Sequence, residues 1–527
     1  MDRTTYADPE VTRLINDNFI SVRVDIDKRP DISERYNRGG FPTTAFLSDR
    51  GESIWGATYI PPSDMKRIIG SILQAMQSGE IDQALTDSRM QDRDMLRASQ
   101  DRSTIGTSDL EEVFEDIFSV YDVEDGGFGG DPKFPQPDFV DVLLFRHKEK
   151  EDPGMADAAI TTLKHMTKGL YDTVDGGIFR YSVTRDWRTP HFEKMLETNL
   201  GFLRNTVHAY IQTGDEEFAR SARGTAEFLL RTLRDPRTGG FYGSQDADEE
   251  YYRLAVEARR LREEPSIDKT IYAGWNADAV SAMLMSGMLL GEREWVEAGL
   301  AAWRNAVARL WDPDRKLLRH VEGDDLFLFE DQVSFFHALI AVFYATGDES
   351  VTGLAEELII AVDNGFANTD GGYNDVMRVR GAIGELDAPR RPLVDNSNWA
   401  LALALFGAIT QNEGYIEKAR SVLSSFTRAE IDAHGIFGAP YLRARWLLER
   451  GPVVVEVCAC PEKMHDPMEL CKSAMSLMHP AIVIRRTVDN NAARPYALVC
   501  VQGKCYPRTE SPDRLRGLLE AALADMR

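Results

Sequence analysis

The sequence has few cysteines, and all of them lie near its carboxyl end. Five occur in 527 residues, and none precedes Cys458. An odd number confined to one end does not suggest the disulfide framework of a secreted domain. The cysteines form two groups: Cys458-Ala-Cys460 with Cys471, and Cys500 with Cys505. A metal site, a redox pair and buried thiols all remain possible roles for these groups. The Cys-x-Cys spacing differs from that of a zinc knuckle. We predict no metal and no cofactor.

Long hydrophobic runs are also missing. A membrane-spanning helix needs roughly 20 apolar residues, and the longest candidate, Ala400 to Ile409, is about half that length. The first ten residues are polar and acidic, without the basic and then apolar order of a secretion signal. These absences predict a cytoplasmic protein with no membrane partner.

Positive charge is scarce. Asp and Glu number 85 against 61 Lys and Arg, which gives a formal net charge of −24. So acidic a surface repels phosphate backbones, which argues against nucleic acid as a partner. Hydrophobic residues make up 43% of the chain, so a large buried core is expected and wholesale disorder is excluded.

Residues 1–80 have the pattern of an α/β domain. Phe19 to Asp25 alternates and then runs apolar as a buried strand does, and Ala45 to Leu47 and Ser53 to Tyr59 predict further strands. Gly40-Phe-Pro-Thr43 resembles the cis-proline turn of thioredoxin-like domains. In that fold the proline faces a Cys-x-x-Cys pair. Because no cysteine occurs in this part of the chain, dithiol chemistry is excluded there.

Glycine-marked turns recur through residues 106–450. They are Asp125-Gly-Gly-Phe128, Asp175-Gly-Gly-Ile178, Thr238-Gly-Gly-Phe241, Asp370-Gly-Gly-Tyr373 and His434-Gly-Ile-Phe437, with Asp312-Pro-Asp-Arg315 in the middle of the one double-length gap. Between turns the pattern is helix, short turn, helix, and the first helix of each pair is the more apolar. Such a period is typical of stacked two-helix units. We predict six hairpins that close into an (α/α)6 toroid with the glycine turns on one rim.

The remaining segments complete the predicted organisation. Residues 81–105 are polar and poor in aromatics, as a linker is. Residues 451–527 contain three buried-strand patterns and a terminal helix, which predicts a small α/β domain. The predicted fold class is multidomain: an incomplete thioredoxin-like α/β head, an (α/α)6 toroid as the main domain and a small α/β tail.

The predicted rim loops hold unusual residue clusters that should converge on one mouth. We predict His191 as the proton-transfer residue, with Glu193, Asp246 and Asp248 as acid, base or hydroxyl-binding groups. The residues predicted to position substrate are Arg180, Tyr181, Trp187, Trp275, Asn276 and Asp331. Indole faces stack on sugar rings and carboxylates bind hydroxyls, so a sugar-like small molecule is the expected ligand. Each residue also has a structural alternative, because loop Asp and Asn cap helices and Trp and His fill cores.

Together these residues resemble one known family, the spermatogenesis-associated protein 20-like proteins. The most specific pieces are Asp131-Pro-Lys-Phe-Pro135, Phe179-Arg-Tyr-Ser182, Trp187 with Pro190-His-Phe-Glu-Lys-Met-Leu196, Gln245-Asp-Ala-Asp248, Trp275-Asn276, and Cys500 with Cys505. The resemblance covers essentially the whole chain. It implies a thioredoxin-like head joined to a six-hairpin barrel similar to those of N-acylglucosamine 2-epimerases and several glycoside hydrolases.

One departure from that family concerns the head. Its members carry a Cys-His-Trp-Cys-His-Val stretch leading into a helix that resembles Met1 to Asp8, and this sequence begins where that stretch would end. We expect a fragment or a misplaced start codon. If the start is real, residues 19–25 and 43–48 must pair with each other or be covered by a partner, because a missing central strand leaves their backbone groups unpaired.

Three functions remain open at this level. The leading hypothesis is a sugar- or carbonyl-acting barrel enzyme, an epimerase, isomerase or glycosidase-like protein, with a regulatory or degenerate head. The alternative is a thioredoxin-like redox-linked or protein-binding adaptor that binds clients around Phe41 and Pro42, with the barrel as scaffold. An inert structural protein would instead pack its rim residues into the core. Substrate, reaction and oligomeric state do not follow from the sequence.

Overall fold

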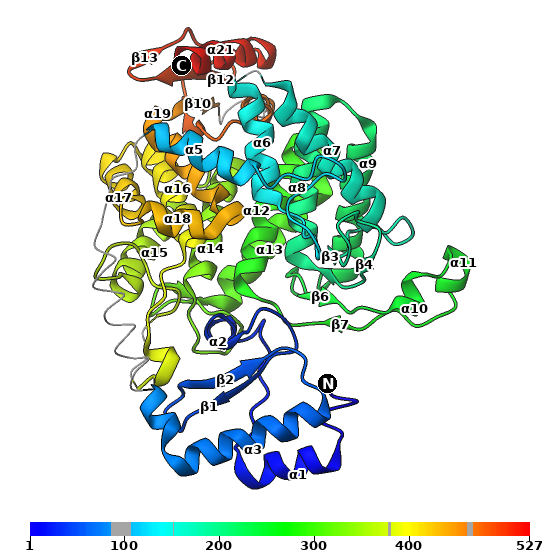
Figure 1. The fold of residues 1–527 in the computed structure, drawn as a ribbon. Helices are drawn as coiled ribbons and strands as arrows, with labels where there is room; N and C mark the ends of the chain where they lie inside the picture. The colour runs from blue at the N-terminus through cyan, green and yellow to red at the C-terminus, as the bar shows by residue number, and fades with distance from the viewer. Residues whose placement is uncertain (86–106, 151, 378–380, 461–466, 527) are drawn as a thin grey trace. The chain divides into compact units, whose positions relative to one another are not determined.

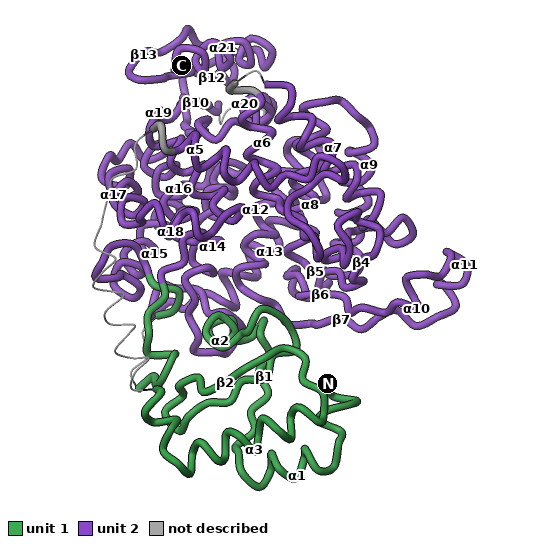
Figure 2. The backbone as a smooth tube through the Cα atoms, viewed as in Figure 1, with its two compact units in different colours: residues 1–103, 374–390 green, residues 104–373, 391–527 purple. Residues whose placement is uncertain are grey.

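A computed structural model describes residues 1–85, 107–150, 152–377, 381–460 and 467–526 (Figure 1). The chain divides into two compact units (Figure 2). One contains residues 1–103 with 374–390, and the other contains residues 104–373 with 391–527. Most of the predicted linker at 81–105 lies outside the described residues. The N-terminal unit thus includes a segment that the repeat pattern had placed inside the toroid.

The N-terminal unit packs three helices against a two-stranded antiparallel sheet. Its elements are α1 (Pro9–Asn18), α2 (Pro30–Tyr36), β1 (Thr44–Leu47), β2 (Ser53–Ala57) and α3 (Pro62–Ser78). Val11, Phe46, Ile60, Met65, Ile69 and Ile72 form its core. The Phe41–Pro42 peptide bond is cis, as the resemblance to a thioredoxin-like turn implied.

The strand predicted at Phe19 to Asp25 is wrong. This segment forms no strand, and Ile20 and Val22 are 95% and 78% exposed. Within the described residues, β1 pairs with β2 alone. An extended apolar pattern becomes a strand only where another strand accepts its backbone hydrogen bonds, and no strand of the described ranges pairs with this segment.

Residues 374–390 are held to the N-terminal unit by one buried arginine of α2. The Arg35 guanidinium pairs with both carboxylate oxygens of Asp375, at 2.6 and 3.2 Å. Its remaining N–H groups donate to the carbonyls of Glu385 at 2.8 Å, Ala388 at 3.0 Å and Asp31 at 3.0 Å. The Arg35 side chain is 1% exposed. The short helix η3 (Gly384–Asp387) is therefore part of this unit and not of the toroid.

We expect Arg35→Met to destabilise the N-terminal unit by about 3 kcal/mol, because the Asp375 carboxylate and three backbone carbonyls lose their donor. Arg67→Met is the matched control, since the exposed Arg67 makes only a surface pair with Asp64. Amide hydrogen exchange of peptides from residues 1–85 at increasing urea gives both free energies of unfolding. Equal losses in the two variants would contradict the proposed role of Arg35.

The second unit contains the predicted (α/α)6 toroid, which is confirmed. Six inner helices each pack on the next, and the last packs on the first. In ring order they are α6 (Pro137–Lys150), α8 (Leu196–Thr213), α12 (Ala273–Leu290), α14 (Phe329–Thr346), α16 (Leu393–Thr410) and α19 (Ala439–Arg450). The outer helices are α7 (Pro153–Leu170), α9 (Glu216–Phe228), α13 (Arg293–Asn305), α15 (Ser350–Phe366), α17 (Glu413–Leu423) and α5 (Thr107–Phe118). Because α5 packs beside α19, the two ends of the repeat close the ring.

Five of the outer helices are followed by the same Asx-type turn. The residues that open these turns are Asp122, Asp172, Asp235, Asp312 and Asn368, and each side chain accepts the backbone N–H two residues later. Asp312 opens the turn between β8 (Trp311–Asp312) and β9 (Leu317–Leu318), where the double-length gap had predicted one. Helices η1 (Leu229–Leu233), η2 (Ala306–Leu310), η4 (Gly435–Gly438) and α18 (Arg428–His434) complete the connections.

Buried amide side chains fasten these turns to the inner helices. The fourth residue of α8, α12, α14 and α16 is Asn199, Asn276, Gln332 and Asn396 respectively. Each amide oxygen accepts the N–H, and each amide nitrogen donates to the C=O, of one turn residue: Ile178, Phe241, Leu318 and Tyr373. All four amides are 0% exposed. We call them the amide clamps.

We expect Asn396→Ala to lower the free energy of unfolding of the toroid by about 2–4 kcal/mol, because it leaves the N–H and C=O of Tyr373 buried and unpaired. Asn364→Ala, at an exposed position of α15, should change it by less than about 0.5 kcal/mol. Urea unfolding followed by circular dichroism compares the two. A loss at Asn396 no larger than at Asn364 would show that the clamp does not stabilise the rim.

Residues 451–527 form a four-stranded sheet with strand order β11–β10–β12–β13. Its elements are β10 (Val453–Ala459), α20 (Met468–Met475), β11 (Ile482–Val488), β12 (Tyr496–Val501), β13 (Lys504–Cys505) and α21 (Pro512–Asp525). The sheet belongs to the same compact unit as the toroid. Arg486 of β11 donates to the carbonyls of Tyr344 and Ala345 near the end of α14, which ties the sheet to an inner helix. No described helix is both long enough and apolar enough to cross a membrane.

Candidate active site

Pairing between short strands on the rim brings part of the predicted site together. They are β3 (Tyr181–Ser182), β4 (Pro190–His191), β5 (Lys194–Met195), β6 (Ser244–Gln245) and β7 (Ile267–Asp268). β3 pairs with β4, and β6 lies between β5 and β7. This pairing brings the turn after α7 beside the turn after α9. Side chains more than fifty residues apart in the sequence therefore meet at the amino end of α8.

His191 lies at the centre of this rim cluster. Its ring stacks on Tyr181 at 4.8 Å, and Tyr181 in turn packs on Phe134 at 4.6 Å. Burial lowers the pKa of His191, although the charges of Glu193 and Asp246 oppose the shift. Its Nδ1 atom has no hydrogen-bond partner in the described part of the chain. His191 is thus a half-buried neutral imidazole beside two carboxylates.

Arg180 and Glu193 form an ion pair across the same hairpin. Arg180 Nη1 lies 2.7 Å from Glu193 Oε2. The next residue, Lys194, is buried and bonds to Asp172 Oδ2 at 2.7 Å. Of the predicted residues, the structure therefore brings together Arg180, Tyr181, His191, Glu193 and Asp246.

Three predicted site residues make structural contacts instead. Asp248 caps α10 (Glu249–Tyr252), where its Oδ1 accepts the N–H of Tyr251 at 2.9 Å. Trp187 is 1% exposed and donates its indole N–H to the carbonyls of Asp125 and Gly126. Asn276 is an amide clamp. The side chains of Trp187 and Asn276 are so enclosed that they have no surface left for a substrate. The sequence could not reveal this, because rim turns are fixed by the same large rings and amides that bind sugars.

The other two predicted residues lie at the first turns of neighbouring inner helices. Trp275 of α12 is half-buried and packs on Tyr272 at 4.7 Å. Asp331 of α14 is buried and accepts hydrogen bonds from the N–H of Gly274 at 2.7 Å and from His320 Nδ1 at 3.0 Å. Asp331 therefore joins α12 to α14 and orients the His320 ring.

Sequence reasoning placed Glu330 and Asp395 among the clusters at the mouth but missed the rest of the polar lining of the ring interior. On α14 the solvent-accessible positions Glu330, Ser334 and His337 interrupt an otherwise buried helix. Their spacing of four and three residues places them on one face. The charges of Arg204 on α8 and Arg443 on α19 act on His337, so this face points into the ring. We call the space that it lines the bore.

The same spacing could have revealed the bore in the sequence. Glu197, Arg204 and His208 lie at seven- and four-residue intervals on α8, and Asp278 lies on α12. Charged residues repeating at this interval within an apolar helix mark a solvated stripe on a helix that is otherwise inside the protein.

One side of the bore is an ion-paired cluster. Arg204 Nη2 lies 2.8 Å from Asp138 Oδ1, and Arg204 Nε lies 2.6 Å from Asp141 Oδ2. His208 Nδ1 lies 2.8 Å from the other Asp141 oxygen. Burial alone would raise the pKa of Asp141, but Arg204 and His208 hold it below its usual range. Asp141 is therefore ionised at neutral pH.

Other residues of the bore are carboxyls that resist ionisation. Burial raises the pKa of Asp278 to about 7, with Asp138 and Glu197 adding to the shift. Glu330 is open to solvent inside the ring, but the protein that surrounds it and the neighbouring charges of Asp331 and Asp395 raise its pKa well above its usual value. Protonated and ionised carboxyls therefore coexist in one enclosed space, which is the condition for paired acid and base catalysis.

One group of side chains in the described residues has the spacing of metal ligands. His320, Glu330 and Asp331 place one donor atom each within 4.8 Å of one another. Asp331 already accepts hydrogen bonds from Gly274 and His320 with both oxygens. Acidic groups with this spacing are common without an ion, so we assign no metal to this group.

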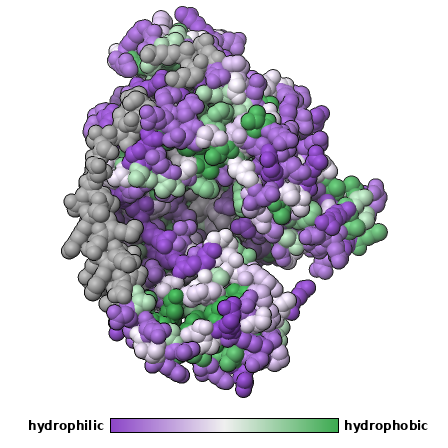
Figure 3. Space-filling view, viewed as in Figure 1, coloured by the Kyte–Doolittle hydropathy of each residue, from purple (hydrophilic) through white to green (hydrophobic). Residues whose placement is uncertain are grey.

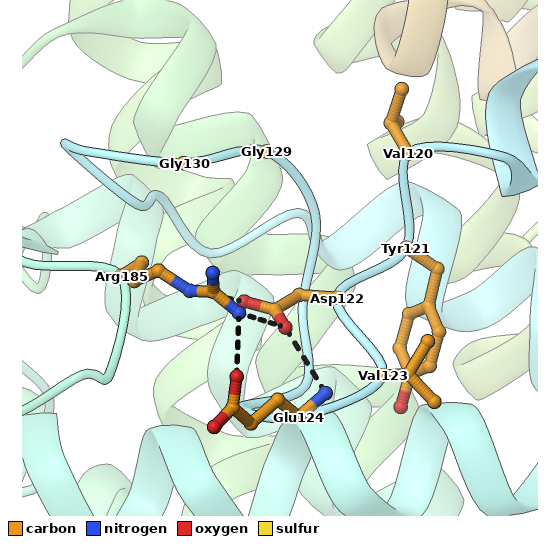
Figure 4. A pocket seen from close by; sticks show the side chains of 8 residues that line it. All are labelled: Val120, Tyr121, Asp122, Val123, Glu124, Gly129, Gly130 and Arg185. Carbon is orange, nitrogen blue, oxygen red and sulfur yellow. Dashed lines mark hydrogen bonds and ion pairs between the residues drawn. The ribbon is translucent and has the colours of Figure 1, made fainter.

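A shallow pocket of about 410 Å³ lies at the first glycine turn (Figure 4). Its lining residues are Val120, Tyr121, Asp122, Val123, Glu124, Gly129, Gly130 and Arg185. Arg185 pairs with Asp122 at 2.8 Å and Glu124 at 3.4 Å, and Lys133 bonds to Asp122 at 2.6 Å. Because its charged groups neutralise one another to hold the turn, the pocket is not the candidate active site.

The toroid has the fold of carbohydrate-active six-hairpin barrels. It is similar to a sugar epimerase from a ruminal bacterium, with a TM-score of 0.52 and 13% sequence identity over 65% of this chain and 99% of that chain. Identity this low shows the fold alone.

The sequence comparisons agree with the predicted family. A family model described as "Thioredox_DsbH: Protein of unknown function, DUF255" matches residues 1–102. Spermatogenesis-associated protein 20 of Mus musculus is 32% identical over 272 residues, and that of Homo sapiens is 30% identical over 272 residues. Each match covers 47% of this chain and 34% of the relative. The resemblance to spermatogenesis-associated protein 20-like proteins is confirmed, and the match spans about a third of these relatives' length.

The raised pKa of Asp278 predicts a stability that falls as pH rises. The groups that face it are Ser334, Arg204, Asp138 and Glu197. Between about pH 4 and 7 the folded state keeps the Asp278 proton that the unfolded state has lost, so deprotonation favours unfolding. We expect the difference in the free energy of unfolding between Asp278→Asn and the wild type to grow in favour of the variant across this range. At pH 7.5 the variant should gain on the order of 2 kcal/mol relative to the wild type.

Urea denaturation at half-unit pH steps measures this difference. The control is Asp314→Asn, in the exposed loop between β8 and β9. A difference between Asp278→Asn and the wild type that stays constant from pH 4 to 7.5 would disprove the assignment.

Proposed function

We propose that this protein is an enzyme that acts on a sugar or a related hydroxy-carbonyl compound by acid–base chemistry in the bore. The observation that carries the proposal is the lining of the ring. Six helices that are buried on their other faces present carboxyls, imidazoles and arginines to its interior. Enclosed ionisable groups destabilise a fold, so a natural protein keeps a cluster of them where they bind or react.

The chemistry follows from the two kinds of carboxyl. A protonated Glu330 or Asp278 is a proton donor for a carbonyl or leaving-group oxygen, and an ionised carboxylate or a neutral imidazole accepts a proton from carbon or from water. Proton transfer beside a carbonyl gives epimerisation or isomerisation, and protonation of a glycosidic oxygen gives hydrolysis. The fold shared with a protein named a sugar epimerase supports a sugar as the substrate.

The rim cluster suits the role of a second contact region. The Phe134 ring, which packs at a tilt on Tyr181, is exposed and offers an aromatic surface of the kind that packs on sugar rings. Arg180, Glu193 and Asp246 supply hydroxyl-binding groups around them. His191 keeps its predicted role as the proton-transfer residue, since its lowered pKa leaves it neutral and able to accept a proton near pH 7.

Calorimetric titration with a panel of neutral mono- and disaccharides tests this function. We expect at least one sugar to bind, Glu330→Gln and His191→Ala to weaken binding or turnover roughly 10-fold or more, and Glu294→Gln, on the exposed face of α13, to have no effect. Incubation in D2O followed by NMR separates the reactions. An epimerase or isomerase exchanges the proton next to the carbonyl, whereas a glycosidase releases a new reducing end.

A protein-binding function is the second candidate, and one observation favours it. The N-terminal unit exposes hydrophobic residues on its surface (Figure 3), among them Phe41 at 55% beside the cis-proline. Extended apolar segments of another protein would cover such a surface. Absence of sugar binding in the wild type, with retained binding of apolar peptides that Phe41→Ser abolishes, would replace the enzymatic proposal with this one.

A further inference from the structure

The carboxyl-terminal hairpin carries the one disulfide among the described residues. Cys500 of β12 and Cys505 of β13 lie opposite each other, one residue pair beyond Val501 and Lys504. The turn between them consists of Gln502 and Gly503, which both have positive φ values of 47° and 79°. Two left-handed residues make a type I′ turn, whose twist matches the strands. The turn therefore holds the two cysteines opposite each other whether or not their sulfurs are bonded.

The two sulfurs differ in how they meet solvent. Cys505 and its neighbour Lys504 are exposed, whereas Cys500 is half-buried. β13 ends the sheet order, so in the described part of the chain no strand covers its outer edge. A small thiol therefore reaches the sulfur of Cys505 without local unfolding.

The other three cysteines provide a contrast within the same domain. Cys458, Cys460 and Cys471 are unbonded and are 4%, 6% and 0% exposed. Cys458 Sγ also lies 3.0 Å from Thr487 Oγ1, in hydrogen-bond contact. These thiols are enclosed by the sheet and its helices and cannot meet a reagent in the native state.

We propose that Cys500 and Cys505 form a reversible thiol–disulfide site that exchanges with small monothiols, and that the incoming thiolate attacks the sulfur of Cys505. This inference does not depend on the enzymatic proposal for the toroid. It assigns a role to a cysteine pair that the sequence pattern left open between metal, redox pair and inert thiols.

The exchange is balanced in two steps. A thiolate bonds to the Cys505 sulfur, the Cys500–Cys505 bond breaks, and Cys500 leaves as a thiolate. A second thiolate attacks the small-molecule sulfur of the mixed disulfide and releases Cys505. Two monothiols are thereby oxidised to one small disulfide, the protein disulfide is reduced to two thiols, and the protons of the monothiols pass to the cysteines.

Reduction changes the contacts at the end of the chain. Lys504 and Tyr506 both bind the Asp525 carboxylate at the end of α21. With the bridge open, the two-residue strand β13 is held by its turn and a few hydrogen bonds alone. The hairpin and the last turn of α21 should then exchange their amide hydrogens faster.

The test is site-resolved alkylation of the full native chain after equilibration with mixtures of reduced and oxidised glutathione. We expect Cys500 and Cys505 to become labelled together as the proportion of reduced glutathione rises, along a curve for a two-electron reduction. Raising the proportion of oxidised glutathione should restore the disulfide and so decrease the labelling. Cys458, Cys460 and Cys471 should react at least about 10-fold more slowly. The proposal is overturned if the pair resists reduction until urea also exposes Cys471.

Single variants identify the attacked sulfur. We expect Cys500→Ser, which leaves the exposed Cys505, to take up glutathione from its oxidised form at least about 10-fold faster than Cys505→Ser, which leaves the half-buried Cys500. Equal rates would refute the assignment of Cys505 as the attacked atom. The labelling of the wild type tests the exchange itself even if a variant folds poorly.

Discussion

The amide clamps are the constraint on which the rest of the toroid depends. A glycine-marked turn exposes backbone N–H and C=O groups, and those groups become buried when the turn folds over the inner helices. An asparagine or glutamine at the fourth position of α8, α12, α14 and α16 satisfies both groups of one turn residue. The rim is therefore fixed at the amino ends of the inner helices. His191, Glu330 and Asp395 lie within a few residues of those ends, so the clamps also set where the candidate site can form.

Two aspartates of the bore show how the surrounding protein gives the same side chain different protonation states. Asp141 and Asp278 are both aspartates on inner helices, but Asp141 is ion-paired with Arg204 and His208, whereas burial raises the pKa of Asp278, with Asp138 and Glu197 adding to the rise. In an enclosed space the energy of an ionised carboxyl depends strongly on its nearest charges. The same side chain is consequently ionised at one position and protonated at the other. This difference within one ring gives the proposed enzyme its acid and its base.

The predictions from sequence succeeded where a local pattern has one structural meaning. The repeat of glycine turns predicted six hairpins, and even the turn at Asp312 was located by counting. They did less well where one residue type serves two purposes. Asn276 and Trp187 were interpreted as substrate-binding residues because amides and indoles bind sugars, yet they clamp and fill the rim. Asp278 and Arg204 were missed because a charged residue on an apolar helix can face either outer solvent or an inner cavity.

The sequence by itself determined the class of the main domain, the order of its hairpins and the family resemblance, because periodicity and turn chemistry act between neighbours in the chain. Only the tertiary structure decided which residues share an environment. It left Phe19 to Asp25 outside the sheet, placed residues 374–390 with the N-terminal unit and joined the carboxyl-terminal sheet to the toroid. Each of these outcomes depends on a partner far away in sequence, such as Asp375 for Arg35 or Tyr344 for Arg486. A buried charge or an open backbone group is satisfied by whichever partner folding brings near, and no local pattern specifies it.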